Sequence, residues 1–145
     1  MIIRANLNDF FNETLHDLPC HYDTKAYIVS IYDKYKKSDS DLSKDSVTLL
    51  YARAKEKQDF SSFQEIGDWV FFTKSLFPEF LTNASEEYYS TLARLSYYSC
   101  FNLINKQWRS FEELADNFIM LENEVKNRLS RNSVFAFSLH NMLSK

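Results

Sequence analysis

Asp68 is the candidate for chemistry that the sequence favours most, because it opens the most apolar run of the chain, Trp69-Val70-Phe71-Phe72. A carboxylate buried in such a run needs hydrogen-bond donors, since an unpaired charge in an apolar environment is costly and the group would protonate instead. Asp68 with a tyrosine could bind a small polar ligand or act as a general base. It could also be a buried structural pair or an exposed acid, and these two structural alternatives are favoured. The donors expected near it are Arg94 and the hydroxyl groups of Tyr88, Tyr89, Tyr97 and Tyr98.

The sequence has few residues at the spacing that a metal site or a nucleophile with its base requires. Glu13-Thr14-Leu15-His16 matches the Glu-x-x-His pattern of di-iron bundles, but such sites need a second copy and further carboxylates, and the sequence has no second copy. Cys20 and His21 are sequence neighbours whose side chains diverge, whereas a nucleophile and its base must face one another. We therefore expect no catalytic metal and no cofactor.

The sequence contains one glycine, Gly67, among 145 residues. P-loops, Rossmann fingerprints and nucleophile elbows each need at least two glycines at fixed spacing, so these phosphate and acyl-transfer sites are excluded. Inside a helix a glycine costs up to about 1 kcal/mol relative to alanine, which indicates that packing or function compensates for it, and packing is favoured. The sequence predicts that Gly67 lies where another helix crosses closely, against a stripe of small side chains formed by Ala93, Ser96 and Cys100.

Helices must position these residues, because apolar side chains return at three- and four-residue steps along most of the chain. One glycine and two prolines leave little material for β-turns, so we expect an all-α fold. The expected architecture is a single domain over residues 1–145, a bundle of about six to seven helices. Because it lacks charge from Leu95 to Asn105, the helix near 85–105 is expected to be the buried central one. The predicted helices cover about 6–17, 23–37, 45–57, 60–76, 85–105, 110 through 121, and 132–143.

Two helix starts carry capping signals. Ser85 is followed by Glu86 and Glu87, which suits both the N-cap and the helix dipole. Ser110 is followed by Glu113, three residues on, which predicts a capping box at the start of the sixth helix.

Charge is distributed unevenly along the chain. Residues 1–124 carry all 20 acids and a balance of −7, whereas residues 125–145 carry no acid and a balance of +4. This basic tail includes a predicted amphipathic helix at 132–143, and it could meet an anionic partner or complement the chain's own acidic face; the second alternative is favoured. An isoelectric point of about 5.6 argues against nucleic-acid binding by the body of the chain. The basic residues of the tail are Lys126, Arg128, Arg131 and Lys145.

Location is predicted from cysteine use and hydropathy. Cys20 and Cys100 belong to no metal-binding or disulfide pattern and are expected to be reduced thiols in a cytoplasmic chain. The sequence has no run of 18 apolar residues, so no membrane span is predicted, and its first residues lack the apolar core of a signal peptide.

Several short motifs follow one another along the chain. They are Tyr27-Ile28-Val29-Ser30-Ile31-Tyr32, Leu49-Leu50-Tyr51-Ala52-Arg53-Ala54, Ile66-Gly67-Asp68, Leu76-Phe77-Pro78-Glu79, Tyr88-Tyr89 and Phe111-Glu112-Glu113-Leu114-Ala115. In this order they resemble a family of small bacterial and phage proteins that has no established activity. The resemblance spans about residues 22–128, and it implies a helical fold without naming a function. Ser75 stands where the family has a glycine that ends a helix. The residues that the resemblance singles out are Gly67, Asp68, Pro78, Glu79, Tyr88 and Tyr89.

The expected function is that of a non-enzymatic helical module that works through protein contacts, either with a partner or with a second copy of itself. A surplus of aromatic residues, the basic amphipathic tail and the lack of a catalytic signature favour this reading. One alternative is a small-molecule-binding protein or enzyme with a polar pocket around Asp68, Arg94, Glu79 and the tyrosines of helix 85–105. A third reading has residues 126–145 bind an anionic surface. A phage origin would favour a component of the virion or of host takeover.

Overall fold

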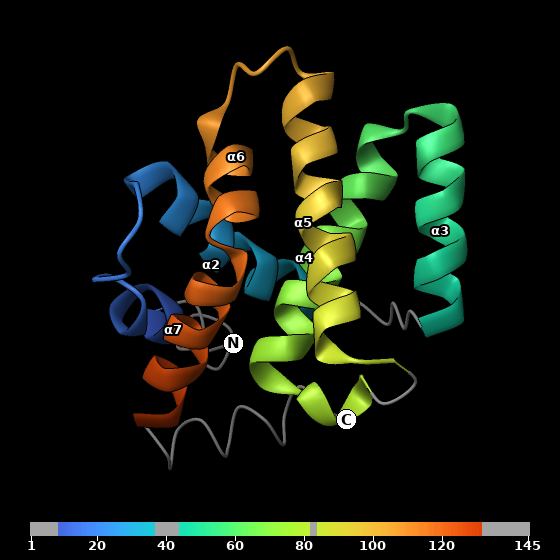
Figure 1. Cartoon of the computed structure of the whole chain (residues 1–145). Helices are drawn as coiled ribbons and strands as arrows, with labels where there is room; N and C mark the ends of the chain where they lie inside the picture. Colours follow the sequence, from blue (N-terminus) through green and yellow to red (C-terminus); the bar gives the residue numbers. More distant parts are fainter. Residues whose placement is uncertain (1–8, 37–43, 82–83, 132–145) are drawn as a thin grey trace.

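The computed structural model describes residues 9–36, 44–81 and 84–131, and these segments form an all-helical bundle, as the sequence predicts (Figure 1). A short helix at residues 9–14 precedes the longer ones. The 3-10 turn η1 (Pro78–Phe80) joins α4 to α5. The other helices are α2 (Tyr22–Lys36), α3 (Lys44–Lys57), α4 (Phe60–Leu76), α5 (Glu86–Leu103), α6 (Arg109–Asp116) and α7 (Phe118–Arg131). The helix predicted at 132–143 lies outside the described residues.

Helix α4 is the most completely buried element. All ten residues from Ile66 to Ser75 are buried, because α2, α3, α5 and α7 each pack on this helix. Helix α5 makes the most extensive contact with α4 and also packs on α6 and α7, as expected of an inner helix. Its outer face is nevertheless open, since Leu95 and Asn102 are exposed. The buried central position predicted for 85–105 is therefore shared with α4, which four helices cover.

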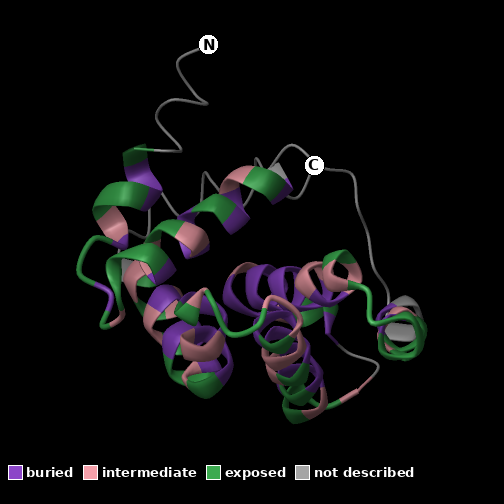
Figure 2. Ribbon diagram, turned by 90° about the horizontal axis from the view of Figure 1, so that it is seen from above, coloured by how far each residue is buried: buried purple, intermediate pink, exposed green. Residues whose placement is uncertain are grey.

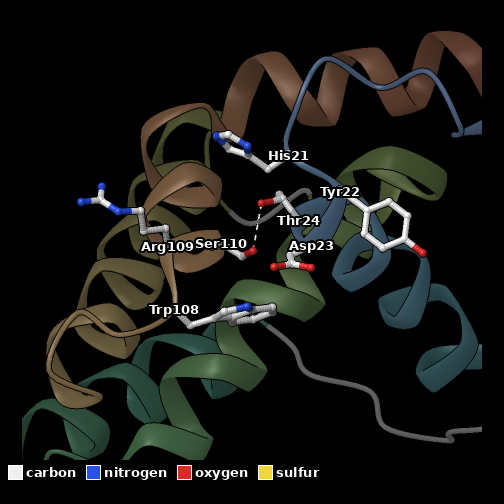
Figure 3. A pocket seen from close by; sticks show the side chains of 7 residues that line it. All are labelled: His21, Tyr22, Asp23, Thr24, Trp108, Arg109 and Ser110. Atoms are coloured by element: carbon white, nitrogen blue, oxygen red, sulfur yellow. Dashed lines mark hydrogen bonds between the residues drawn. The ribbon is translucent and has the colours of Figure 1, made fainter.

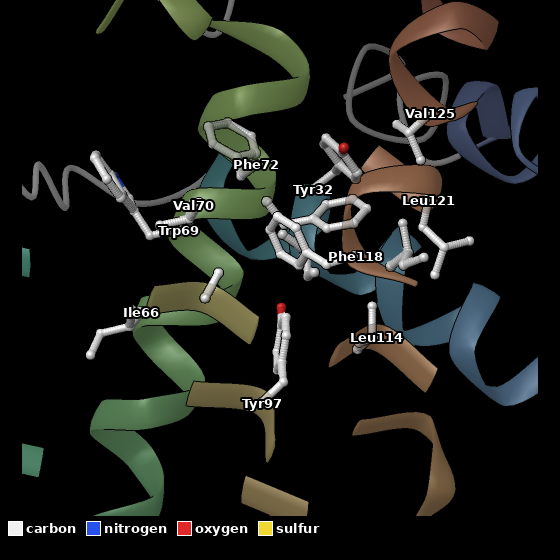
Figure 4. Close-up of a cluster of buried hydrophobic side chains, with 14 of the residues drawn as sticks. Tyr32, Ile66, Trp69, Val70, Phe72, Tyr97, Leu114, Phe118, Leu121 and Val125 are labelled. Atoms are coloured by element: carbon white, nitrogen blue, oxygen red, sulfur yellow. The ribbon is translucent and has the colours of Figure 1, made fainter. Parts of the chain in front are cut away.

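Aromatic side chains fill the core, and the buried faces of the helices turn toward the interior of the bundle (Figure 2). Phe11 stacks on Tyr32 at 4.7 Å between ring centroids, and Tyr32 lies 5.6 Å from Phe72. Figure 4 shows Tyr32, Phe72 and Phe118 lying between α2, α4 and α7. Rings of this size bury large areas with few rotatable bonds, so a chain of this length can build a substantial core.

The predicted sixth helix is divided into α6 and α7 at Asn117, which has φ −114° and ψ 24°. The backbone N–H of Asn117 donates to Glu113 at 2.9 Å, and that of Leu121 donates to the carbonyl of Asn117 at 2.8 Å. The two helices thus meet at Asn117, whose backbone donates to the end of α6 and accepts from the first turn of α7. The start of α5 is as predicted, since the Ser85 hydroxyl accepts the backbone N–H of Tyr88 at 3.1 Å.

Among the described residues, no helix is long and apolar enough to span a bilayer.

Candidate functional site

Asp68 lies in the middle of α4 and is 3% exposed. Its Oδ1 accepts hydrogen bonds from the hydroxyls of Tyr27 on α2, at 2.6 Å, and Tyr97 on α5, at 2.7 Å. Its Oδ2 accepts one from Nζ of Lys34 on α2, at 3.1 Å. Three donors from two neighbouring helices therefore hold one buried carboxylate.

The electrostatics of this cluster follow from its burial. Burial raises the pKa of Asp68, while the Lys34 ammonium and the two tyrosine hydroxyls oppose that rise. Burial and the adjacent carboxylate raise the pKa values of Tyr27 and Tyr97, so both rings stay neutral and donate their protons. Lys34 is 46% exposed, so the cluster has one charged group at its solvent side. Because both carboxylate oxygens already accept donors, the arrangement favours the structural alternative for Asp68 over a general base.

Gly67 lies directly under the ring of Tyr97. A Cβ placed on Gly67 would lie 2.6 Å from Cζ of Tyr97 and within 2.9 Å of two more ring atoms. The missing side chain therefore lets this ring cross α4 and reach the acid one residue further on.

The predicted small-residue stripe lies on the buried side of α5, but the side chain nearest Gly67 is the ring of Tyr97 and not a member of the stripe. Ala93, Ser96 and Cys100 are all fully buried. The thiol of Cys100 lies 3.8 Å from the carbonyl oxygen of Phe60, at the start of α4. Burial raises the pKa of Cys100 to about 12, so this thiol stays protonated.

Arg94, Tyr88 and Tyr98 bind other parts of the chain, so their prediction as donors to Asp68 is wrong. Arg94 donates through Nε to the carbonyl of Ala115 on α6, at 2.9 Å. The hydroxyl of Tyr88 pairs with Thr48 of α3 at 2.6 Å. Tyr88, Arg94 and Tyr97 leave α5 in different directions, toward α3, α6 and α4 respectively. Of these three, Tyr97 is the one that faces α4. Of the remaining candidates, Tyr89 is buried beside Tyr88, Tyr98 donates to Asp116, and Glu79 is exposed in η1.

Sequence reasoning missed the two donors from α2. Tyr27 and Lys34 are seven residues apart, which places them two turns apart on one face of a helix. That spacing was available in the sequence, but nothing local indicates that this face of α2 meets Asp68. The contact is a consequence of the tertiary fold.

A second buried polar cluster joins α4, α5 and α7. Nζ of Lys74 lies 3.3 Å from Oε1 of Glu122 and donates to the Ser90 hydroxyl at 2.7 Å. Glu86, at the start of α5, lies 3.9 Å from the same Nζ. Lys74 and Glu122 are both buried, so they form an ion pair out of contact with solvent. Oε2 of Glu122 has no hydrogen-bond partner among the described residues.

The Ser110–Glu113 capping box is a wrong prediction, because α6 begins at Arg109 and Trp108 occupies the N-cap position. Glu113 instead accepts the backbone N–H of His21, at 3.2 Å, and the Thr24 hydroxyl, at 2.5 Å. These donors lie at the amino-terminal end of α2. The acid therefore caps a neighbouring helix, where a carboxylate also suits the helix dipole.

An open pocket of about 340 Å³ lies beside this cap, where the amino-terminal ends of α2 and α6 meet (Figure 3). Tyr22 at its rim is 74% exposed, and Trp108 is half-buried. Asp68 does not line it. The lining residues are His21, Tyr22, Asp23, Thr24, Trp108, Arg109 and Ser110.

The basic tail is described only in part. Arg128 binds Asp17, with Nε 2.9 Å from Oδ1, and also binds Glu124. Both acids raise the pKa of Arg128, which keeps its charge and complements the acidic part of the chain. Lys126 is half-buried on α7, whereas the side chain of Arg131 and the whole of Lys145 lie outside the described residues.

Metal ligation has no candidate in the described part of the chain, where no three His, Cys, Asp or Glu side chains are grouped closely enough to hold an ion. Comparisons with protein-family models, with curated proteins and with solved structures give no match, so the family resemblance stays a prediction.

Proposed function

We propose that this chain is a non-enzymatic protein-interaction module that contacts its partner through the surface around the pocket between α2 and α6. The observation that carries the proposal is the aromatic rim of that pocket, where Tyr22 is 74% exposed beside the half-buried Trp108. Tyrosine and tryptophan are enriched at the centres of interfaces, because they bury a large area and still offer a polar group.

Other exposed apolar side chains are distributed over the surface, and single exposed apolar residues are normal in a folded protein. Tyr22 differs from them because it borders a concave site with polar and aromatic walls. The others are Leu49, Phe80, Leu95, Ile119 and Met120.

The buried polar side chains that could take part in catalysis bind other side chains of the same protein, and this supports the same proposal. Asp68 binds three donors, and the Lys74–Glu122 pair is buried between helices. These groups link α2, α4, α5 and α7, which favours an architectural role for them. A small-molecule site around Asp68 would require Arg94 and the other α5 tyrosines beside it, and they face other helices.

Photo-crosslinking in the native cells tests the proposal. The photoreactive residue p-benzoylphenylalanine replaces Tyr22 in one variant and Leu49, an equally apolar exposed residue of α3, in the control. We expect an ultraviolet-dependent adduct of discrete mass from position 22 and none from position 49. No adduct at 22, or the same adducts at both positions, would contradict the proposal.

Light scattering of the purified chain shows whether the partner is a second copy. A mass near twice the 17.2 kDa of one chain would identify self-association, and the Tyr22 adduct should then contain two copies. A strict monomer at high concentration leaves a different protein as the partner, and the adduct mass gives its size.

A further inference from the structure

The pocket between α2 and α6 combines an acid with an aromatic ring. Asp23 and Trp108 both line it, and in the view of Figure 3 the Asp23 carboxylate lies above the indole ring. Asp23 is exposed and forms no ion pair with any side chain that the structure describes. Resting on the proposed function, we infer that this pocket binds a cationic side chain, an arginine or a lysine, of the partner protein.

The indole of Trp108, which forms the aromatic wall of the pocket, is held in place by two other aromatic rings. The indole of Trp108 packs edge-to-face against Tyr27 at 5.5 Å and Phe111 at 5.1 Å between ring centroids. A cation is attracted to the face of such a ring, and a guanidinium can also stack on it. The chain itself uses this interaction at the rim, where Nζ of Lys25 lies 5.2 Å from the centroid of Tyr22.

The charge around the pocket favours a cation despite the two helix ends. Each helix amino terminus carries a partial charge of about +0.5, which an anion could use. The Glu113 carboxylate already binds the end of α2, and Asp23 adds a second negative charge. Arg109 pairs with Glu112 at 3.1 Å and points away from the pocket in Figure 3. Lys25 at the rim is directed to the Tyr22 ring and to the carbonyl of His16, so Asp23 keeps no cationic partner among the described side chains. The acidic balance of residues 1–124 would also attract a basic partner.

The size of the pocket also suits a side chain. About 340 Å³ is near the lower limit for ligand pockets, so it fits an extended arginine or lysine better than a large cofactor. Its open mouth lets a side chain enter while the partner's backbone stays on the surface.

Nuclear magnetic resonance of the full ¹⁵N-labelled chain tests this inference with Nα-acetyl-arginine amide as the probe. The chain has two tryptophans, and Trp69 lies in the core of α4, so its indole N–H serves as an internal reference. We expect a saturable shift of the Trp108 indole signal and no shift of the Trp69 signal. Nα-acetyl-citrulline amide, which has nearly the same shape without the charge, should produce at most a small fraction of that shift.

Asp23→Asn should weaken binding of the arginine probe about fivefold, the loss expected for one partly exposed ion pair. The matched control, Glu56→Gln, removes an exposed acid from α3 and should leave binding unchanged. Equal binding of the citrulline compound, a Trp108 shift with inorganic phosphate in place of the arginine probe, or no shift at all would overturn the inference. An adduct at position 22 without a response to the arginine probe rejects the cation pocket and keeps the proposed function. A Trp108 response without an adduct keeps the cation-binding pocket and rejects its use in binding a partner protein.

Discussion

Gly67 and Asp68 act on the same residue, Tyr97, in complementary ways. The glycine provides the space for the tyrosine ring, and the acid accepts its hydroxyl at 2.7 Å. Each residue alone would lower the stability of the fold, because a glycine weakens a helix and a buried acid loses its hydration. Together they fix where α5 crosses α4.

Gly67→Ala should lower the free energy of unfolding by about 1–2 kcal/mol, because overpacking a fixed core costs about 1–3 kcal/mol and alanine recovers up to about 1 kcal/mol in helix propensity. The Tyr97 ring is fully buried and cannot move aside easily. Urea unfolding measures the loss. In a Tyr97→Leu background the same substitution should cost much less, and a stabilised Gly67→Ala protein would contradict the assigned role.

Asp68→Asn should change how stability depends on pH. Burial raises the pKa of Asp68 above 3.8, its unfolded value, so the folded state holds this proton more tightly than the unfolded state. This group's stabilising contribution is full below pH 3.8 and is lost as the pH rises through the folded pKa. The difference in unfolding free energy, wild type minus variant, should therefore fall with rising pH.

Asp17→Asn is the control for that sign, because the pKa of Asp17 is lowered by its hydrogen bond to Arg128. Its stabilising contribution is present above the unfolded pKa and is lost as the pH falls, so the same difference should rise with pH. A difference for Asp68→Asn that is flat or rises with pH would show that burial does not dominate its titration.

At the scale of elements, the sequence predicts which segments are helical but not how their side chains pair. Apolar periodicity locates α2 to α5 within a few residues, and Pro78 ends α4 as expected. The division of 110–121 at Asn117 has no glycine or proline to indicate it. Glu113 has the spacing of a capping box, yet the fold places a second helix end within its reach, and it binds that end instead.

Glu113→Gln should lower the free energy of unfolding by about 1–2 kcal/mol, because it weakens the cap of α2 and removes a negative charge near the helix dipole. The neighbouring Glu112→Gln breaks an exposed pair with Arg109 and should cost less than about 0.5 kcal/mol. Thermal unfolding of both variants measures the contrast. Equal losses would mean that Glu113 contributes no more than a surface acid.

Glu122→Gln should be more damaging, because it leaves the buried Lys74 ammonium with only the exposed Glu86, 3.9 Å away, as a counter-ion. Breaking a buried pair costs about 3–5 kcal/mol. The double variant Lys74→Met with Glu122→Leu removes both charges and should recover most of that loss. Urea unfolding of Lys74→Met, Glu122→Leu and their double variant forms the cycle. A double variant as unstable as the sum of its single changes would contradict a coupled pair.

At the scale of the whole molecule, composition predicts the fold class and local pattern predicts much of its order, but the candidate site depends on distant contacts. Asp68 and Gly67 can be selected from the sequence because each is unusual within a helix. Lys34 and Tyr27 cannot be assigned to Asp68, because their role depends on how α2 packs on α4. The pocket beside Trp108 is formed by segments more than eighty residues apart, so no local pattern indicates it.

Both thiols should report unfolding of the whole bundle. Burial raises the pKa of the half-buried Cys20 to about 11 and that of Cys100 to about 12, so little thiolate is present at pH 8. We expect Ellman's reagent to react slowly with the native chain and rapidly in denaturant, with the change following the unfolding transition. Rapid reaction of Cys100 in native buffer would show local opening at the α4–α5 contact.

The cap that Glu113 provides for α2 also affects the order in which the chain can mature. The backbone N–H of His21 receives its acceptor from a residue 92 positions later. During synthesis, the first turn of α2 is therefore left without this partner until most of the polypeptide has emerged from the ribosome. Completion of this cap is thus a late event, coupled to the synthesis of α6, and a chain truncated before residue 113 would lack it.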